Sequence, residues 1–307
     1  MLAVDVLIPV YRPGKEFERL LEKLSQQNYP IGRIILMNTE KKYFPEGLDE
    51  RYSNVDVYHL TKEEFDHGGT RDRGMRLSDA DVVVCMTQDA VPVDGTLIKE
   101  LLAPFENPDV CAAYARQLPA KECREVEKYT RSFNYPEKSR VKGKADLEEL
   151  GIKTFFCSNV CAAWRRDAYL ELGGFVKRTI FNEDMIYAGK LIQNGRLIAY
   201  CADAKVVHSH NYSAMQQFHR NFDLAVSQVM HPEVFGGIRS ESEGIRLVKR
   251  SIQYCFKIKK PWLIIQVVTQ SAGKLLGYKL GQRYQKLPKK IILWCTMNRS
   301  FWQGEEL

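Results

Sequence analysis

The sequence predicts an α/β fold in which a mostly parallel central sheet is flanked by helices and followed by a helical, basic C-terminal extension. Three observations predict it. Short apolar runs rich in β-branched residues recur along the first part of the chain, helical patterns separate them, and polar residues follow each run directly. Because the runs do not alternate between apolar and polar residues, we expect strands that are buried on both faces.

The predicted elements follow one another in βα order. The first strand, 4–10 ("VDVLIPV"), leads into a helix with one apolar face over 14–28, and the second strand follows at 33–38. The later elements are expected as strands at 55–60, 81–86 and 110–116 and a helix at 95–106.

The stretch "HGGTRDRG" (67–74) lies between the third and fourth strands. We expect a short helix to begin here, near Gly69 or Thr70. Gly68 and Gly69 would let the backbone turn sharply and come close to a ligand. The first amides of the helix would then point at negative charge.

Composition restricts the class of protein. With 45% hydrophobic and 27% charged residues, the chain is expected to be globular and not disordered. Its eight cysteines include no Cys-x-x-Cys pair, which favours buried free thiols and a reducing compartment. The first apolar run contains Asp5, so we interpret it as a strand and not as a signal peptide. No apolar run reaches the roughly 18 residues that a membrane-spanning helix needs.

Polar residues at four strand ends are expected to converge on one crevice. They lie in "PVYRP", "NTE", "HGGTR" and "TQDA", and ligands bind in open α/β sheets beyond the carboxyl ends of the strands. The glycine pattern of dinucleotide-binding folds and the lysine loop of ATP-hydrolysing proteins are both missing. A nicotinamide-dependent or ATP-hydrolysing enzyme therefore loses its usual support.

Four candidate residues have a structural interpretation beside a functional one. Asp89 is a turn aspartate, or it binds Mg²⁺ or Mn²⁺ together with a substrate phosphate. Asp184 lies in the first turn of a helix that starts at Asn182, where the helix dipole favours an acid. His208 ends a predicted strand, and His210 follows two residues later on the same face, a pattern less typical of a purely structural histidine.

The order of these motifs resembles the inverting glycosyltransferases of family 2, which have the GT-A fold, over residues 3–215. "VDVLIPVYRP" is similar to the opening strand of that family, "HGGTRDRGM" to its Ala-Arg-Asn-x-Gly segment and "MTQDA" to its DxD region. "CSNVCAAWRRDAYLELGGF" is similar to the stretch ending in Gly-Gly-Phe, and "NEDM" to the Glu-Asp motif. "FDHGGTRDRG" together with "TQDA" looks most like the rhamnosyltransferase-type members, which use dTDP-L-rhamnose.

The resemblance implies a catalytic base and a metal site. Asp184 matches the base that removes the acceptor hydroxyl proton as that oxygen attacks the anomeric carbon. Asp89 matches the second carboxylate of the DxD motif and would hold Mg²⁺ or Mn²⁺ against the leaving diphosphate. Thr87 occupies the first aspartate position of that motif, and His208 would complete the ligand shell.

The resemblance also implies a binding site for the sugar donor. Pro9, Tyr11 and Arg12 match the nucleotide-contacting end of the first strand, and Glu40 falls near an aspartate that hydrogen-bonds the base. The implied donor-binding set is Pro9, Tyr11, Arg12, Glu40, His67, Gly68, Arg71, Gln88 and Asp89.

Domain boundaries follow from the resemblance and from charge. Residues 117–156 carry mixed charge and aromatic side chains, as an acceptor-binding loop or a solvated surface helix would. We expect a catalytic domain over 1–230, with a nucleotide-binding half at 1–116 and an acceptor and catalytic half at 117–230, then a linker at 231–245 and a basic amphipathic helical extension at 246–307.

The extension differs from the rest of the chain in charge. It holds 13 Lys or Arg and two Glu, whereas the preceding residues carry 32 basic and 36 acidic side chains. It is a helical appendage with a solvated basic face, or an interfacial membrane anchor with Trp262, Trp294 and Trp302 at the boundary. We favour binding to an anionic membrane surface, while a basic tail could equally serve self-association.

The function implied is transfer of L-rhamnose from dTDP-L-rhamnose to a glycan or a polyprenyl-diphosphate-linked saccharide, in cell-surface polysaccharide synthesis, on the cytoplasmic face of the cell membrane. A UDP- or GDP-sugar donor is the alternative within the same fold. A sugar nucleotidyltransferase needs a glycine-rich basic loop after the first strand, which "YRPGKEFERLLEKL" does not supply. A nucleic-acid binder would suit the basic extension, but no reading motif is present and the rest of the chain is slightly acidic.

Overall fold

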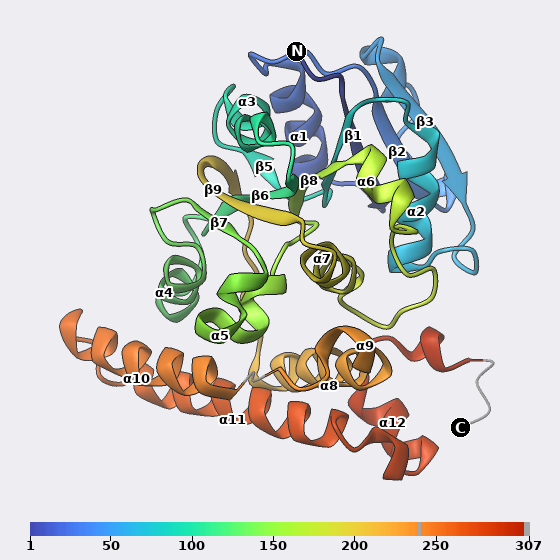
Figure 1. Ribbon diagram of the computed structural model, residues 1–307. Coiled ribbons are helices and arrows are strands. Elements are labelled where there is room, and N and C mark those ends of the chain that lie inside the picture. The colour runs from blue at the N-terminus through green and yellow to red at the C-terminus, as the bar shows by residue number, and fades with distance from the viewer. Residues whose placement is uncertain (239–240, 304–307) are drawn as a thin grey trace. The chain divides into compact units, whose positions relative to one another are not determined.

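The computed structural model describes residues 1–238 and 241–303, which form two compact units (Figure 1). The first unit comprises Met1–Ala120, Tyr135–Arg178 and Glu183–His208. The second comprises Lys121–Asn134, Thr179–Asn182 and the described residues from Ser209 on.

A single sheet runs through the first unit. Within the described residues it has nine strands, of which eight follow the order β3-β2-β1-β4-β8-β6-β9-β5, and β7 pairs with β9. The strands are β1 (Val4–Tyr11), β2 (Ile34–Thr39), β3 (Val55–Leu60), β4 (Val82–Met86), β5 (Val91–Pro92), β6 (Val110–Leu118), β7 (Arg140–Lys142), β8 (Cys161–Arg165) and β9 (Leu197–Val207).

The N-terminal part of this sheet is parallel, as predicted. β1 pairs in parallel with β2 and β4, and β2 pairs in parallel with β3. β8 lies antiparallel between β4 and β6, so the complete sheet is mixed. All five strands predicted in the first 116 residues are present, and the continuous apolar run of β4 is buried along its whole length.

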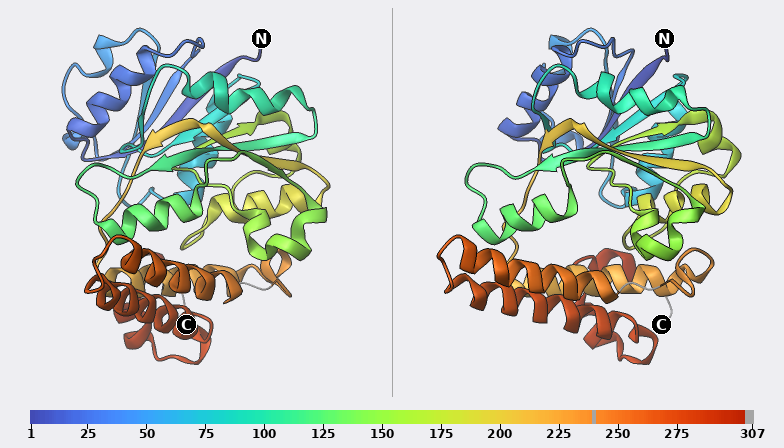
Figure 2. Two further views of the ribbon diagram at one scale, coloured as in Figure 1. Left: turned by 90° about the vertical axis from the view of Figure 1, so that its left-hand side faces the viewer. Right: turned by 60° about the vertical axis from the view of Figure 1, so that its left-hand side comes forward.

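Helices cover both faces of the sheet (Figures 1 and 2). α1 (Lys15–Ser25) and α3 (Leu97–Leu102) share one apolar core with Val6 and Ile8 of β1. α2 (His67–Leu77) packs its Gly74 against Leu7, whose side chain points to the opposite face because side chains alternate along a strand. The remaining helices of this unit are α5 (Leu147–Leu150), α6 (Arg166–Glu171) and α7 (Glu183–Gln193).

The second unit is helical. None of the described helices is long and apolar enough to cross a membrane. The predicted basic extension is mostly helical in its described part, and its last four residues, 304–307, lie outside the described part of the chain. The helices are α4 (Glu125–Asn134), α8 (Ala214–Met230), α9 (Pro232–Phe235), α10 (Glu241–Lys257), α11 (Leu263–Gly281) and α12 (Lys289–Cys295).

α11 packs against α8 through a glycine stripe, which consists of Gly273, Gly277 and Gly281. A Cβ atom at Gly277 would overlap the carbonyl oxygen of Phe218 in α8, and the two other glycines meet α8 carbonyl oxygens in the same way. Small residues four positions apart let two helix backbones approach closely. The stripe therefore places one side of α11 directly on the α8 backbone.

The predicted division into a catalytic domain (1–230), a linker (231–245) and an extension (246–307) is a division by function and stays a prediction. By contacts, α8 belongs to the same unit as α10, α11 and α12. The predicted linker contains α9 and the first residues of α10, while residues 239–240 within it lie outside the described residues.

Candidate active site

The site begins where β1 and β4 separate. β1 pairs with β4 only as far as Leu7, whereas its pairing with β2 continues to Tyr11. Pro9 lies between these two positions, and Gln88 then joins the two strand ends through its side-chain amide. The Tyr11 N–H donates to Gln88 Oε1 (2.8 Å), and Gln88 Nε2 donates to the Tyr11 carbonyl (3.0 Å). Such a switch point is where open α/β sheets bind ligands.

Aromatic and cationic groups gather at the end of β1. Arg12 Nη2 donates to the Tyr43 hydroxyl (2.8 Å), and the guanidinium lies 4.4 Å from the Tyr43 ring centroid. The Tyr11 ring meets the Tyr43 ring edge-on, with 5.8 Å between centroids. Both Tyr11 and Arg12 are exposed, so they offer flat surfaces on which a nucleotide base can stack. Sequence reasoning did not find Tyr43.

Glu40 lies next to this aromatic group, after β2. The Lys62 N–H donates to Glu40 Oε1 (2.9 Å), and Lys42 Nζ lies 3.2 Å from Oε2. The hydrogen bond from the Lys62 amide lowers the pKa of Glu40 most, and the contact with Lys42 lowers it further. Glu40 thus stays an anionic acceptor, and its contact with a base remains a prediction.

The start of α2 differs from the prediction. The helix begins at His67, two or three residues earlier than expected, because Asp66 Oδ1 accepts from the Gly68 and Gly69 N–H groups (3.0 and 2.7 Å). The prediction that these amides point at a ligand's negative charge was therefore wrong, since the protein's own carboxylate binds them. A Cβ atom at Gly68 would overlap the Val176 carbonyl oxygen, so this glycine permits close backbone packing.

His67 and Arg71 of the predicted donor-binding set lie on the first turns of α2. The His67 ring packs edge-on against Phe65, with 5.2 Å between centroids. Arg71 is buried; its Nη1 donates to the His67 carbonyl (2.9 Å) and lies 3.1 Å from Glu183 Oε1. Burial by itself would raise the pKa of Glu183. The opposing contributions, of which the Arg71 charge is the largest, outweigh burial, so the pKa of Glu183 lies below its usual value. This ion pair ties α2 to the start of α7.

Asp184 follows Glu183 but has a different environment. It is partly exposed, whereas Glu183 is buried. Its Oδ2 accepts from the Asn159 N–H (3.0 Å) and its Oδ1 from the Met185 N–H (2.7 Å). Burial of the carboxyl group and then the neighbouring Glu183 charge raise the pKa of Asp184 to about 7. Asp184 is therefore the carboxylate that can exchange a proton near neutral pH.

Asn159 holds both carboxylates and was not found by sequence reasoning. Besides its N–H bond to Asp184, its Nδ2 donates to Glu183 Oε1 (3.2 Å). Its Oδ1 accepts from Trp164 Nε1 (2.9 Å), which fixes the orientation of the amide. The role of this buried asparagine depends on a residue 25 positions further along the chain, so no local pattern indicates it.

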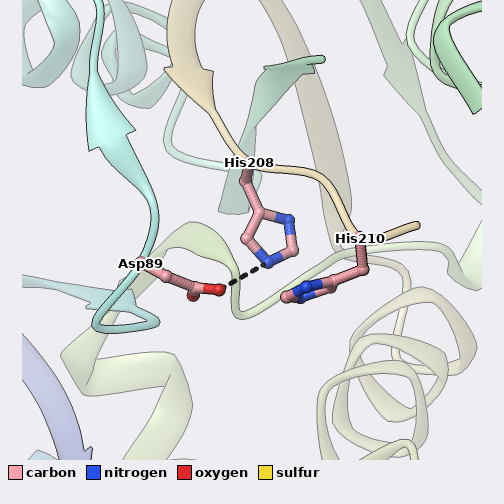
Figure 3. A group of neighbouring side chains, drawn as sticks. All are labelled: Asp89, His208 and His210. Atoms are coloured by element: carbon pink, nitrogen blue, oxygen red, sulfur yellow. Dashed lines mark ion pairs between the residues drawn. The ribbon is translucent and has the colours of Figure 1, made fainter. Parts of the chain in front are cut away.

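The predicted metal ligands Asp89 and His208 come together, and His210 joins them (Figure 3). One ligand atom from each of the three residues lies within 4.8 Å of the others, and Asp89 Oδ2 is 3.6 Å from His208 Nε2. His208 Nδ1 faces Gln117 Oε1 at 3.2 Å. Because this amide oxygen can only accept, Nδ1 carries the proton and the lone pair of Nε2 points towards Asp89. One carboxylate and two imidazoles fit a divalent cation such as Mn²⁺.

A backbone hydrogen bond relates the carboxylate pair to the candidate cation ligands. The Thr87 N–H donates to the Val160 carbonyl (3.1 Å), and Asn159, which binds Asp184, directly precedes Val160. Asp89 lies two residues after Thr87. The candidate base and the candidate cation ligands thus lie at the same end of the β4–β8 pair.

Two solved structures share the fold. A mannosyltransferase, PcManGT from Pyrobaculum calidifontis, solved in complex with GDP-Man and Mn²⁺, has a TM-score of 0.56 and 16% identity, covering 98% of this chain and 84% of that one. TarS 1–349 from S. aureus has a TM-score of 0.54 and 12% identity, covering 93% and 91%. These likenesses confirm the predicted GT-A fold.

Two curated proteins are similar over nearly the whole length. The chain is 39% identical to the O-antigen chain rhamnosyltransferase RfbN of Salmonella typhimurium, covering 99% of this chain and 97% of that protein. It is 36% identical to the O-antigen chain rhamnosyltransferase WbaN of Salmonella anatum, with the same coverage. Residues 5–173 match the family described as Glycosyl transferase family 2. The chain therefore belongs to glycosyl transferase family 2.

Proposed function

We propose that this glycosyltransferase moves L-rhamnose from dTDP-L-rhamnose, with inversion, to a saccharide acceptor in cell-surface polysaccharide synthesis. The observation that carries the proposal is Asp184, whose carboxylate has a pKa of about 7 and shares one end of the β4–β8 pair with Asp89 and His208. The names of the two curated relatives support rhamnose as the sugar. A UDP- or GDP-sugar donor is the alternative.

Asp184 acts as the general base. Its carboxylate accepts the proton of the acceptor hydroxyl while that oxygen attacks the anomeric carbon and the bond to the diphosphate breaks. The Asn159 N–H and the Met185 N–H hold both carboxylate oxygens in place. The Arg71–Glu183 ion pair fixes the first turn of α7 from which Asp184 projects. No covalent intermediate is needed.

Asp89, His208 and His210 would hold a divalent cation, Mn²⁺ being favoured over Mg²⁺ by the two imidazoles. When bound, the cation neutralises charge on the leaving diphosphate. Gln117 orients the His208 ring for this contact through Nδ1. Thr87 then needs no role as a ligand.

The nucleotide lies on the aromatic group after β1. Tyr11, Arg12 and Tyr43 supply stacking surfaces and a positive charge, and Glu40 supplies an acceptor for a base N–H. Gln88 keeps the ends of β1 and β4 at a fixed separation through its two bonds to Tyr11. Donor binding by the exposed His67 belongs to the same proposal.

The acceptor in this proposal is a glycan or a polyprenyl-diphosphate-linked saccharide. A lipid-linked acceptor would bring the enzyme to the cytoplasmic face of the cell membrane. The basic second unit supports this location better than it supports nucleic-acid binding, because the chain carries no nucleic-acid reading motif.

Thermal unfolding of the full-length protein tests the identity of the donor. The protein is measured with dTDP-L-rhamnose, a UDP-sugar or a GDP-sugar, each with and without Mn²⁺. Ligand at 100 times its Kd stabilises the folded state by about 2.7 kcal/mol. We expect the largest rise of the midpoint with dTDP-L-rhamnose and Mn²⁺. A larger rise with a UDP- or GDP-sugar would establish the alternative donor, and a product that retains the donor's anomeric configuration would exclude the inverting mechanism.

A further inference from the structure

We infer that the outer side of α11 docks onto an anionic lipid surface. The docking face consists of Trp262, Ile265, Val268, Leu275 and Leu276, all exposed in the described structure. The inference deepens the proposed function, in which the acceptor is lipid-linked, by naming the surface that meets the lipid.

Three residues of the docking face lie on the side of α11 away from the glycine stripe. At 100° per residue, Ile265, Val268 and Leu275 project from the side of α11 that points away from Gly277. Gly277 is buried against α8, whereas Ile265 is 72% exposed and Leu276 is 59% exposed. The contact with α8 thus forces this apolar side outward.

The composition of α11 is unusual for a helix with an exposed side. Its 19 residues contain no acid, and Lys274 and Lys279 are its charged side chains. A helix that is apolar around most of its circumference is normally buried, and a large exposed apolar patch marks an interaction site. Because none of the described helices can cross a membrane, a position along the lipid surface is the remaining way for lipid to cover this side.

Positive charge flanks both ends of the docking face. Residues 244–303 contain no Asp or Glu. Lys257 and Lys259 are exposed before α11, and Lys289 and Lys290 are exposed at the start of α12. α12 also has two exposed apolar side chains, Ile291 and Trp294, which follow these lysines in the sequence. Each Lys or Arg near an anionic bilayer contributes about 1 kcal/mol to binding.

This charge distribution favours lipid over a second copy of the chain. Two docking faces brought together would also bring their lysines together, and like charges across an interface oppose association. Anionic headgroups have the complementary charge, and the acyl region accepts the apolar side chains between them. An anionic bilayer therefore satisfies both parts of the surface.

The test is co-sedimentation of the full-length protein with vesicles of phosphatidylcholine alone or of phosphatidylcholine with phosphatidylglycerol, without nucleotide sugar. We expect binding to the anionic vesicles, weak binding to the neutral ones, and weaker binding as salt rises. Since no sugar donor is present, the result is independent of the proposed reaction.

Two pairs of substitutions separate the apolar and the charged contributions. Ile265→Ser with Leu276→Ser, and Lys289→Glu with Lys290→Glu, should each weaken binding to anionic vesicles by about tenfold or more. Lys15→Glu with Arg19→Glu on the exposed side of α1 makes the same charge change in the other unit, and Val141→Ser removes an exposed apolar side chain of β7. We expect these controls to bind like the unmodified protein.

Unchanged binding of both docking-face variants would overturn the inference, as would an unmodified protein that does not distinguish the two vesicle types. A dimer in sedimentation equilibrium that Ile265→Ser with Leu276→Ser dissociates would assign the face to a second copy instead. Thermal unfolding checks that the variants are folded; the changed side chains are exposed, so their midpoints should match that of the unmodified protein.

Discussion

Two adjacent carboxylates, those of Glu183 and Asp184, have different surroundings. Glu183 is buried and lies 3.1 Å from Arg71, so it stays ionised and holds α2 to α7. The Asp184 carboxylate accepts from the Asn159 and Met185 N–H groups, and burial and then the Glu183 charge raise its pKa to about 7. Neighbouring acids whose pKa values are pushed apart commonly divide structural and proton-transfer roles.

Asp184→Asn should lower the transfer rate about 10²- to 10⁴-fold, because the amide cannot accept the acceptor's proton. Donor binding should stay close to that of the unmodified protein, since the candidate nucleotide contacts lie on other residues. Single-turnover transfer and donor titration measure the two effects. Asp79→Asn, an exposed carboxylate in the same unit, is the matched control. Near-normal transfer by Asp184→Asn would reduce Asp184 to a helix-start residue.

The pH dependence follows from the same group. The base must be ionised, so kcat/KM should rise as the pH increases through about 7 and level off above it. The sign for stability is opposite. The pKa of Asp184 is about 7 in the folded protein and near 4 in the unfolded chain. The protonated carboxyl therefore contributes stability that is fully present below pH 4 and is lost as the pH rises through about 7. An activity profile that is flat from pH 5 to 8 would contradict the assignment.

Asn159→Asp should move the acidic limb of this profile to higher pH, because it adds negative charge beside both carboxylates. Asn159→Ala removes the side-chain bonds to Glu183 and Trp164 without adding charge. If Asn159 positions Asp184 and influences its pKa, only the aspartate variant moves the acidic limb of the profile to higher pH. Equal profiles for the two variants would leave Asn159 with a structural role alone.

Residue types at strand ends predicted much of the candidate site but not its internal contacts. The sequence placed Asp89 after a strand and His208 at the end of another, and the fold brings them to 3.6 Å. Tyr43, Asn159 and Gln117 carry no local signal, because each acts through a partner distant in the chain.

At the scale of elements, glycines set how closely helices approach other backbone. Gly68 lets α2 lie against the backbone at Val176, and Gly277 lets α11 lie against α8. In both helices the glycine conformation is ordinary, so the absence of a Cβ atom is what matters. A glycine pair such as Gly68 and Gly69 looks the same in the sequence whether it forms a ligand-contacting turn or permits close backbone packing.

Gly277→Leu should destabilise the second unit by about 2 kcal/mol or more, because its side chain would have to occupy the position of the Phe218 backbone. Leu276→Ala, one position away on the exposed side, should change stability by less than about 0.5 kcal/mol. Urea unfolding followed by tryptophan fluorescence measures both. Equal stability of the two variants would show that α11 does not pack closely on α8 in solution.

At the scale of the whole molecule, the sheet joins a parallel half to a mixed half. β4 belongs to the first, β8 to the second, and the candidate base and cation ligands lie where these two strands meet. Folding therefore creates the site as a whole, and ligands of the site should stabilise the complete first unit.

Removal of divalent cations should abolish most of the stabilisation that the donor provides. With Mn²⁺ the donor should raise the unfolding midpoint by several degrees, and with a chelator by much less. Asp89→Asn should behave with Mn²⁺ as the unmodified protein does with chelator. A donor that stabilises equally in both conditions would show that the diphosphate binds without a cation.

The local sequence was enough to predict the strands of the parallel half, the buried free cysteines and the helical basic extension. Runs of apolar residues indicate burial on both faces of a strand, and runs of basic residues indicate the charge of the extension. The motif order was enough to indicate the family. Only the folded chain revealed the antiparallel β8, the link from Asn159 to both carboxylates and the outward apolar side of α11. Each of these depends on contacts between residues far apart in the sequence, whose energies no local pattern contains.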